Sequence, residues 1–169
     1  SPGAGLYGLT MTDATTLTNF NVTNNTGVTN GGGIFFSSVG TSLTITNSNI
    51  DNNTLTTTDG GGLYLSGDAT TSATLTGGSV SGNSGRNGGG ILIINGPSLV
   101  ASGLDISGNQ STSGGGGVTV SGTCLLDISR STIRGNPAGS YGGGINTAGT
   151  VTLTNCIVSG NRAELTRYS

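Results

Sequence analysis

The sequence predicts an all-β fold: a right-handed parallel β-helix (β-solenoid) of about six coils of 27–29 residues, with three short strands per coil. Three observations predict it. Glycine triplets recur at a nearly constant interval, β-prone runs follow each triplet, and an asparagine holds a constant place in each repeat. A fixed period of about 20–50 residues is typical of solenoids, propellers and repeat arrays.

The triplets mark the coil boundaries. They fall at Gly31–Gly33, Gly60–Gly62, Gly88–Gly90, Gly115–Gly117 and Gly142–Gly144, and Gly3-Ala4-Gly5 is a degenerate first copy. Their spacings of 29, 28, 27 and 27 residues divide the chain into coils at approximately 3–30, 31–59, 60–87, 88–114, 115–141 and 142–169. We therefore expect residues 1–169 to form a single solenoid domain, with the glycines at corners where backbones approach closely.

Each coil contains three β-prone runs. The first follows the triplet, as in Ile91-Leu92-Ile93, and the second follows a turn, as at Leu126 and Ile128. The third ends at an aliphatic residue, namely Val22, Ile50, Val80, Ile106, Ile133 and Val158. All three alternate apolar and polar residues with the period of two that is typical of half-buried strands. Three short strands without hairpin connections wind most simply into one β-helix coil.

An asparagine stands three residues after the last aliphatic residue of every coil. These residues are Asn25, Asn53, Asn83, Asn109, Asn136 and Asn161. Stacked coils would place them above one another, so their side-chain amides could hydrogen-bond along the stack as asparagine ladders do in cross-β assemblies. We therefore predict a structural Asn ladder.

Composition narrows the possible functions. Charged residues make up 7% of the chain, histidine and lysine are absent, and the net charge is −2. This charge excludes a nucleic-acid partner, which requires basic patches, and no apolar run reaches the ~18 residues of a membrane span. Without histidine or an acidic cluster, we expect no metal and no cofactor. Abundant Ser, Thr and Asn indicate an extracellular or cell-surface protein. Cys124 and Cys156 are expected as reduced thiols, with a disulfide as the alternative.

The repeat resembles known surface proteins. The pattern Gly32-Gly33-Ile34 and its copies, followed by Val80-Ser81-Gly82-Asn83 and Ile106-Ser107-Gly108-Asn109, is similar to right-handed parallel β-helix repeat proteins of bacterial cell surfaces, often described with choice-of-anchor sorting segments. It also resembles the repeats of polymorphic outer-membrane protein autotransporter adhesins, with an aliphatic residue in place of their Phe. The resemblance covers nearly the whole chain and implies a β-helix on a bacterial surface.

Many β-helices act on polysaccharides, so a carbohydrate-binding or carbohydrate-active β-helix is the first alternative. Glycoside hydrolysis requires a carboxylate pair at a defined separation, but the acidic residues occupy different positions in the repeat. The best local group is Asp127, Arg130 and Arg134 with Asp105 one coil earlier. One such group on neighbouring surface positions is typical of a solvated salt-bridge cluster. We therefore predict no catalytic residues.

Two outward faces are candidate interaction surfaces. Outward positions of the first strand form an apolar stripe of Tyr7, Phe35, Tyr64 and Leu92, which could receive a neighbouring subunit, a covering loop or sugar rings. Outward positions of the second strand form a Thr-x-Thr face of Thr16, Thr18, Thr44, Thr46, Thr74, Thr76, Thr152 and Thr154. This face resembles those of ice-binding solenoids, although Thr also favours exposed strands and stacked pairs. Val100 and Asp127 interrupt it.

The repeats run from Gly3 to Asn161, so we expect both ends of the stack to expose strand edges and aliphatic layers. Either identical chains stack head to tail into a fibre, or the chain is a segment of a longer surface protein. The predicted function is a non-enzymatic extracellular structural or adhesive β-solenoid. Its predicted partners are copies of itself, end to end and laterally, with surface glycans as the alternative.

Overall fold

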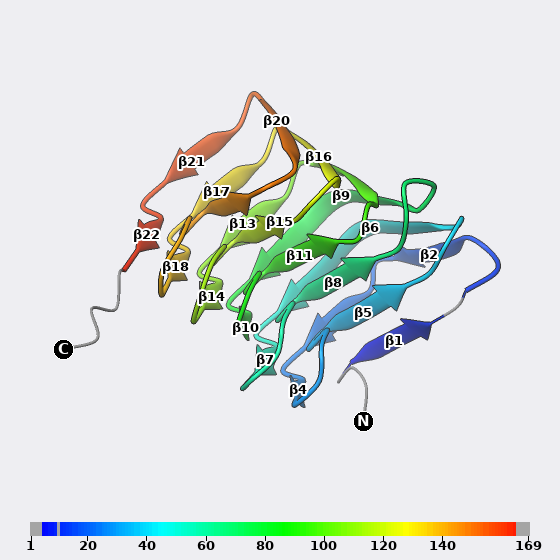
Figure 1. Ribbon diagram of the computed structural model, residues 1–169, viewed down its shortest axis with the longest axis horizontal. Helices are drawn as coiled ribbons and strands as arrows, with labels where there is room; N and C mark the ends of the chain where they lie inside the picture. The colour runs from blue at the N-terminus through cyan, green and yellow to red at the C-terminus, as the bar shows by residue number, and fades with distance from the viewer. Residues whose placement is uncertain (1–4, 10, 165–169) are drawn as a thin grey trace.

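The computed structural model describes residues 5–9 and 11–164, and its strands wind into a stack of β-coils with β1 and β22 at opposite ends (Figure 1). One strand of each coil, directly after the glycine triplet, belongs to a six-stranded sheet that we call sheet 1. Its members are β1 (Leu6–Leu9), β5 (Ile34–Ser37), β8 (Leu63–Ser66), β11 (Ile91–Ile94), β15 (Val118–Val120) and β19 (Ile145–Thr147). Every neighbouring pair is parallel.

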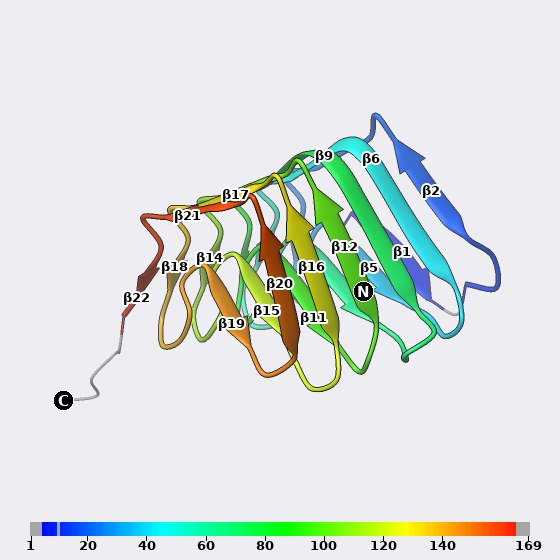
Figure 2. The same ribbon diagram turned by 90° about the horizontal axis from the view of Figure 1, so that it is seen from above.

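The second and third predicted runs of each coil lie together in one larger sheet, sheet 2, which Figure 2 shows from above. Its first arm contains β2 (Thr15–Thr18), β6 (Ser42–Asp51), β9 (Ser72–Ser81), β12 (Ser98–Ser102), β16 (Leu125–Ser129) and β20 (Thr150–Thr154). Its second arm contains the far ends of β6 and β9 with β3 (Asn21–Thr23), β13 (Asp105–Ser107), β17 (Thr132–Arg134) and β21 (Ile157–Ser159). A residue with positive φ separates the arms in every coil, for example Asn47 and Gly103.

A third sheet, sheet 3, consists of two-residue strands. They are β4 (Thr26–Gly27), β7 (Thr54–Leu55), β10 (Ser84–Gly85), β14 (Gln110–Ser111), β18 (Pro137–Ala138) and β22 (Arg162–Ala163). Each directly follows the asparagine of the predicted Asn ladder in its coil, and it pairs in parallel with the neighbouring strands of the sheet. The three-sheeted parallel solenoid therefore confirms the predicted fold class. The sequence did not indicate that the third sheet lies beyond the asparagine, because a two-residue strand carries no periodicity.

The core is a single column of small aliphatic side chains inside the coils. Within coils two to five the inward positions are almost fully buried, and the largest buried side chains include Ile34, Leu43, Leu63, Leu75, Ile91, Ile106, Leu126 and Ile128. Each side chain packs on the equivalent one of the next coil, since the register pairs Ile50 with Val80 and Val80 with Ile106. No coil has a core of its own, so the apolar burial comes from stacking.

The last described coil is open. Its inward residues Leu153 and Val158 are 43% and 51% exposed, whereas Ile128 and Ile133 at the same positions one coil earlier are 0% exposed. At the other end of the stack, Leu6, Met11 and Leu17 are half-buried and pack against the core. Both ends were expected to expose aliphatic layers. The inward side chains of β20 and β21 are exposed, whereas Val22 in β3 of the first coil is only 5% exposed, so the expectation is met in part.

The second glycine of a triplet is tested by a matched pair of substitutions. A β-carbon at Gly89 would lie against the backbone carbonyls of Gln110 and Gly116 in the next coil, while one at Gly122 has open space and only an unfavourable φ of 65°. We expect Gly122→Ala to cost about 1–2 kcal/mol of unfolding free energy and Gly89→Ala distinctly more, because the coils must separate. Urea denaturation measures both; equal costs would contradict this explanation.

Candidate functional site

The Asn ladder is the most regular polar feature of the structure. The side-chain Nδ2 of each asparagine donates to Oδ1 of the next, at distances of 2.8–3.1 Å from Asn25 through to Asn161. The same Oδ1 also accepts the main-chain N–H of the preceding asparagine. The second Nδ2 hydrogen donates to the carbonyl of an aliphatic residue one coil earlier, as from Asn83 to Ile50. The predicted ladder is thus present along the whole stack.

This ladder satisfies polar groups that would otherwise be costly to bury. Asn53, Asn83, Asn109 and Asn136 are all 0% exposed. Each uses both Nδ2 hydrogens and receives two hydrogen bonds at Oδ1, as Asn109 does with Val80, Asn136 and the two donors of Asn83. A buried amide with all its hydrogen bonds made has no desolvation penalty left uncompensated.

The third glycine of each triplet makes room for the ladder. A β-carbon at Gly90 would meet the amide of Asn109 at 2.9 Å, and one at Gly62 would meet the amide of Asn83 at 2.9 Å. The same contact recurs between Gly144 and Asn161. The glycine triplet and the ladder asparagine therefore depend on each other, because the missing β-carbon leaves space for the amide. In the sequence they were recognised as two separate motifs.

The apolar stripe lies on the outward side of sheet 1, but only its first half is open. Tyr7 is 40% exposed and Phe35 is half-buried, whereas Tyr64 and Leu92 are 7% and 3% exposed. The expectation of a fully exposed stripe is therefore wrong for Tyr64 and Leu92. The turn before each glycine triplet folds over them, and a β-carbon at Gly60 or Gly88 would collide with these two side chains.

A second ladder of polar side chains, which the sequence analysis did not predict, holds the covering turns in place. It uses the residue directly before each triplet. Oδ1 of Asn30 accepts the N–H of Asp59, Oδ1 of Asp59 accepts the N–H and Nδ2 of Asn87, and Oδ1 of Asn87 accepts the N–H of Gly114. Arg86 reinforces it with two 3.0 Å hydrogen bonds to Asp59. The available signal was the recurrence of Asn or Asp before Gly in three successive coils.

Ring stacking limits what the stripe can bind. The ring centroids of Tyr7 and Phe35 lie 4.9 Å apart and those of Phe35 and Tyr64 4.8 Å apart, with interplanar angles of 14° and 16°. Both faces of Phe35 are therefore occupied by neighbouring rings. A sugar that stacks on an aromatic residue needs a free ring face, so Phe35 offers only its edge to a ligand.

The Thr-x-Thr face has the predicted register. Thr16 pairs with Thr44 and Thr44 with Thr74, while Thr18, Thr46 and Thr76 form the parallel row. Thr44 and Thr46 are half-buried, and the remaining six threonines of the face, which include Thr152 and Thr154, are exposed. Val100 and Asp127 follow Thr74 in the same row and separate it from Thr152. The continuous array is therefore two residues wide and three coils long.

The charged group around Asp105 is a surface cluster. Arg134 donates to Oδ2 of Asp105 at 2.8 Å, and the two side chains are 56% and 41% exposed. Arg130 instead donates to Ser102, at 2.8 Å. An exposed pair of this kind contributes about 0–1 kcal/mol. The structure therefore brings together only Asp105 and Arg134 of the four predicted residues, while Asp127 lies on the outward row of the neighbouring arm.

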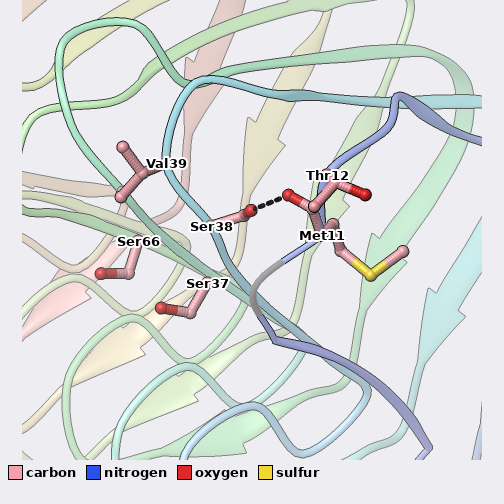
Figure 3. A pocket seen from close by; sticks show the side chains of 7 residues that line it. Met11, Thr12, Ser37, Ser38, Val39 and Ser66 are labelled. Carbon is pink, nitrogen blue, oxygen red and sulfur yellow. Dashed lines mark hydrogen bonds between the residues drawn. The ribbon is translucent and has the colours of Figure 1, made fainter.

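A cleft lies where the chain leaves sheet 1 in the first three coils. It has a volume of about 380 Å³ and is lined by Met11, Thr12, Ser37, Ser38, Val39, Ser66 and Gly67. Figure 3 shows Ser38 turned toward Met11, whose carbonyl accepts its hydroxyl at 2.7 Å. Ser37 and Ser66 are partners in the register of β5 and β8. The lining offers hydroxyl and backbone groups without a side chain that titrates near neutral pH, so it can hold polar groups but supplies no acid or base.

Other chemistry-bearing residues are dispersed. Cys124 and Cys156 are free thiols, the first buried and the second half-buried, and burial raises the pKa of Cys124. Among residues 5–9 and 11–164, no three His, Cys, Asp or Glu side chains gather closely enough to hold a metal ion. Within the same residues, no helix is long and apolar enough to span a membrane.

A family comparison agrees with this architecture. The model described as "Right handed beta helix region" matches residues 4–167. The chain belongs to this right-handed β-helix family. A search of curated proteins and a search of solved structures found no match. Membership gives the β-helix its right hand and confirms the β-helix level of the resemblance, while the narrower surface-protein resemblance stays a prediction.

Removal of one ladder residue tests the role of the asparagines in this β-helix. Asn83→Ala leaves two donors of Asn53 and the carbonyl of Ile50 without hydrogen-bond partners. Because each unpaired buried group costs about 1–3 kcal/mol, we expect a loss of at least about 3 kcal/mol. Asn21→Ala, on an exposed outward position of β3, is the matched control and should change stability by less than about 0.5 kcal/mol. Similar effects in the two variants would contradict the ladder's role.

The burial of Tyr64 in the apolar stripe predicts that the stability of the fold depends on pH. Burial raises the pKa of Tyr64 above its ordinary value, and the nearby Asp59 raises it further against a smaller lowering by Asn30. The folded protein thus holds the phenol proton more tightly than the unfolded chain. Its contribution to stability is complete below the unfolded pKa of about 10 and is lost as the pH rises through the folded value.

We therefore expect the unfolding free energy of this β-helix to fall above about pH 10, and Tyr64→Phe to reduce that fall. Denaturation at a series of pH values measures it. Tyr141→Phe, which removes a hydroxyl from a 63% exposed side chain, is the matched control. An unchanged pH dependence in Tyr64→Phe would refute the buried-phenol explanation.

Proposed function

We propose that this β-helix is a non-enzymatic structural or adhesive element of an extracellular or cell-surface protein. Its role is to form a stiff rod that carries or spaces other parts of a surface assembly. Each coil adds one inter-strand spacing of roughly 4.8 Å, so six coils extend the rod by about 29 Å. The bacterial setting follows from the resemblance of the repeats to bacterial surface proteins.

The observation that carries the proposal is that the carboxylates of Asp51, Asp59 and Asp105 join adjacent coils. Asp51 accepts hydrogen bonds at 2.8–2.9 Å from Ser79 and Ser81 one coil later. Asp59 binds Arg86, and Asp105 binds Arg134, again one coil later. A catalytic acid or base needs a carboxylate presented to a substrate at a defined distance from a second group. These carboxylates instead join adjacent coils, which favours a structural role.

The open end of the stack supports extension of the rod. Strands β19 to β22 form the outer edge of all three sheets, and the aliphatic layer beneath them is exposed. An edge with unpaired backbone groups and an apolar layer is a template for another strand. Further coils on this end would lengthen the rod, whether they come from a longer surface protein or from another copy of the chain.

Two alternatives draw on the outward faces. A carbohydrate-binding role would use the open end of the stripe, where Tyr7 has one ring face that Phe35 does not cover. Ice binding would use the six in-register threonines of β2, β6 and β9. Glycan arrays and ice-recrystallisation assays separate these alternatives, with Tyr7→Ala and Thr46→Tyr as the respective loss-of-binding variants.

The non-enzymatic proposal predicts that purified protein releases no product from a panel of neutral and uronic-acid polysaccharides. Reducing-end and unsaturated-product assays, with a protein-free control, measure this. Asp105→Asn and Arg134→Gln remove the best charged pair. Product formation that these variants abolish would overturn the structural proposal in favour of a carbohydrate-active β-helix.

A further inference from the structure

The chain contains three asparagines that directly precede a glycine, and the structure places them in two different settings. They are Asn30, Asn87 and Asn95. A side-chain amide before a glycine is open to attack by the main-chain nitrogen of that glycine, because the glycine has no β-carbon to hinder the approach. The hydrogen bonds that hold these two groups therefore decide which of the three pairs can react in the folded protein.

Asn30 and Asn87 belong to the second ladder of polar side chains, which holds both reacting groups of each pair. Oδ1 of Asn30 accepts the main-chain N–H of Asp59. Asn87 accepts the N–H of Gly114 at Oδ1 and donates from Nδ2 to Asp59. The main-chain nitrogens of the glycines that follow donate to carbonyl oxygens of the next coil at 3.1 Å. Both asparagines are half-buried, so either pair can react only after hydrogen bonds between coils have opened.

Asn95 lies outside this ladder, at the corner between β11 and β12. It is exposed, and its φ of 66° lies in the left-handed region. The main-chain nitrogen of Gly96 donates to Sγ of Cys124 at 3.2 Å, rather than to a carbonyl oxygen. Sulfur is a weak acceptor, so this nitrogen is held less firmly than the nitrogens of Gly31 and Gly88.

The side chain of Asn95 is positioned for loss of its amide nitrogen. Nδ2 donates to Oγ of Ser66, one coil earlier, at 2.9 Å. A hydroxyl group both accepts and donates hydrogen bonds, so Ser66 can return a proton to this nitrogen as it leaves. The corner therefore brings together a loosely held nucleophile, a leaving group and a proton donor, and its exposure admits water.

We infer that Asn95 and Gly96 form a self-modification site, at which the folded protein converts the asparagine to an acidic residue. The main-chain nitrogen of Gly96 forms a bond to Cγ of Asn95, and the bond from Cγ to Nδ2 breaks. Nδ2 leaves as ammonia with the proton that the glycine nitrogen gives up, and a cyclic succinimide remains. Water then adds to one of the two ring carbonyls and opens the ring, which leaves aspartate or isoaspartate at residue 95.

The modification changes the charge of this corner. Each converted chain gains one negative charge beyond its net charge of −2. The new carboxylate lies beside the corner of the preceding coil, where Asp68 accepts hydrogen bonds from Thr70 and Thr71. The two corners approach closely, since a β-carbon at Gly96 would lie 3.2 Å from the main-chain carbonyl carbon of Asp68. The modification is independent of the proposed structural function, because it requires no partner and no reactant besides water.

The test follows all three pairs in the same molecule. The full chain is incubated in mildly alkaline buffer, folded in one sample and unfolded by denaturant in another, and peptide mapping by mass spectrometry measures conversion at each asparagine. In the unfolded chain, Asn30, Asn87 and Asn95 should convert at similar rates. In the folded chain, Asn95 should convert at least about tenfold faster than the other two, because their conversion requires several hydrogen bonds between coils to open first. Equal rates at the three positions of the folded chain, or no conversion of Asn95 there, would overturn the inference.

A substitution gives an independent readout. Asn95→Gly removes the amide, and glycine accepts the positive φ without strain. On anion exchange this variant should lack the acidic species that appears in the parent chain. Asn155→Gly is the matched control and should keep that species, because Asn155 is also exposed with a φ of 53° but precedes Cys156 rather than a glycine. An acidic species that persists in Asn95→Gly would contradict the assignment of the site.

Discussion

The structure depends on one constraint: every residue must be compatible with an equivalent residue one strand spacing above and below it. A buried polar side chain can meet this condition only if it donates in one direction and accepts in the other. Asparagine does both, and the four fully buried ladder residues donate both side-chain N–H groups and accept two hydrogen bonds at Oδ1, as Asn109 does. Small aliphatic side chains meet the same condition by packing against aliphatic side chains of the adjacent coils, as Val80 does between Ile50 and Ile106.

The glycine triplets follow from the same constraint. A side chain is excluded at each of the three positions for a different reason. Gly88 has a positive φ, a β-carbon at Gly89 would meet carbonyl oxygens of the next coil, and a β-carbon at Gly90 would meet the ladder amide. The missing β-carbon at the third position leaves the space that the ladder amide occupies. The covering turns over Tyr64 and Leu92 are a further result, because the chain must bend sharply to enter each triplet.

Much of the fold was predictable because stacked coils place equivalent residues at a nearly constant interval in the sequence. The six asparagines, the inward aliphatic positions and the threonine rows could be placed from spacing alone, and the register confirms them. The exposure of the stripe could not, since whether Tyr64 is covered depends on the path of the turn around Asp59 rather than on any period. Sheet 3 was missed because its strands are two residues long. Of the predicted group of Asp105, Asp127, Arg130 and Arg134, only Asp105 and Arg134 pair, because Arg130 turns to Ser102 instead.

The central claim is that the coils are held as one cooperative stack by the Asn ladder. Native-state hydrogen exchange measures this most directly, through the main-chain N–H groups of Asn53, Asn83 and Asn109, each of which donates to the next asparagine side chain. The account predicts that these three amides exchange only through global unfolding and share one opening free energy, equal to that from denaturation. Rapid exchange at the ladder, or amides that open coil by coil with unrelated free energies, would contradict it.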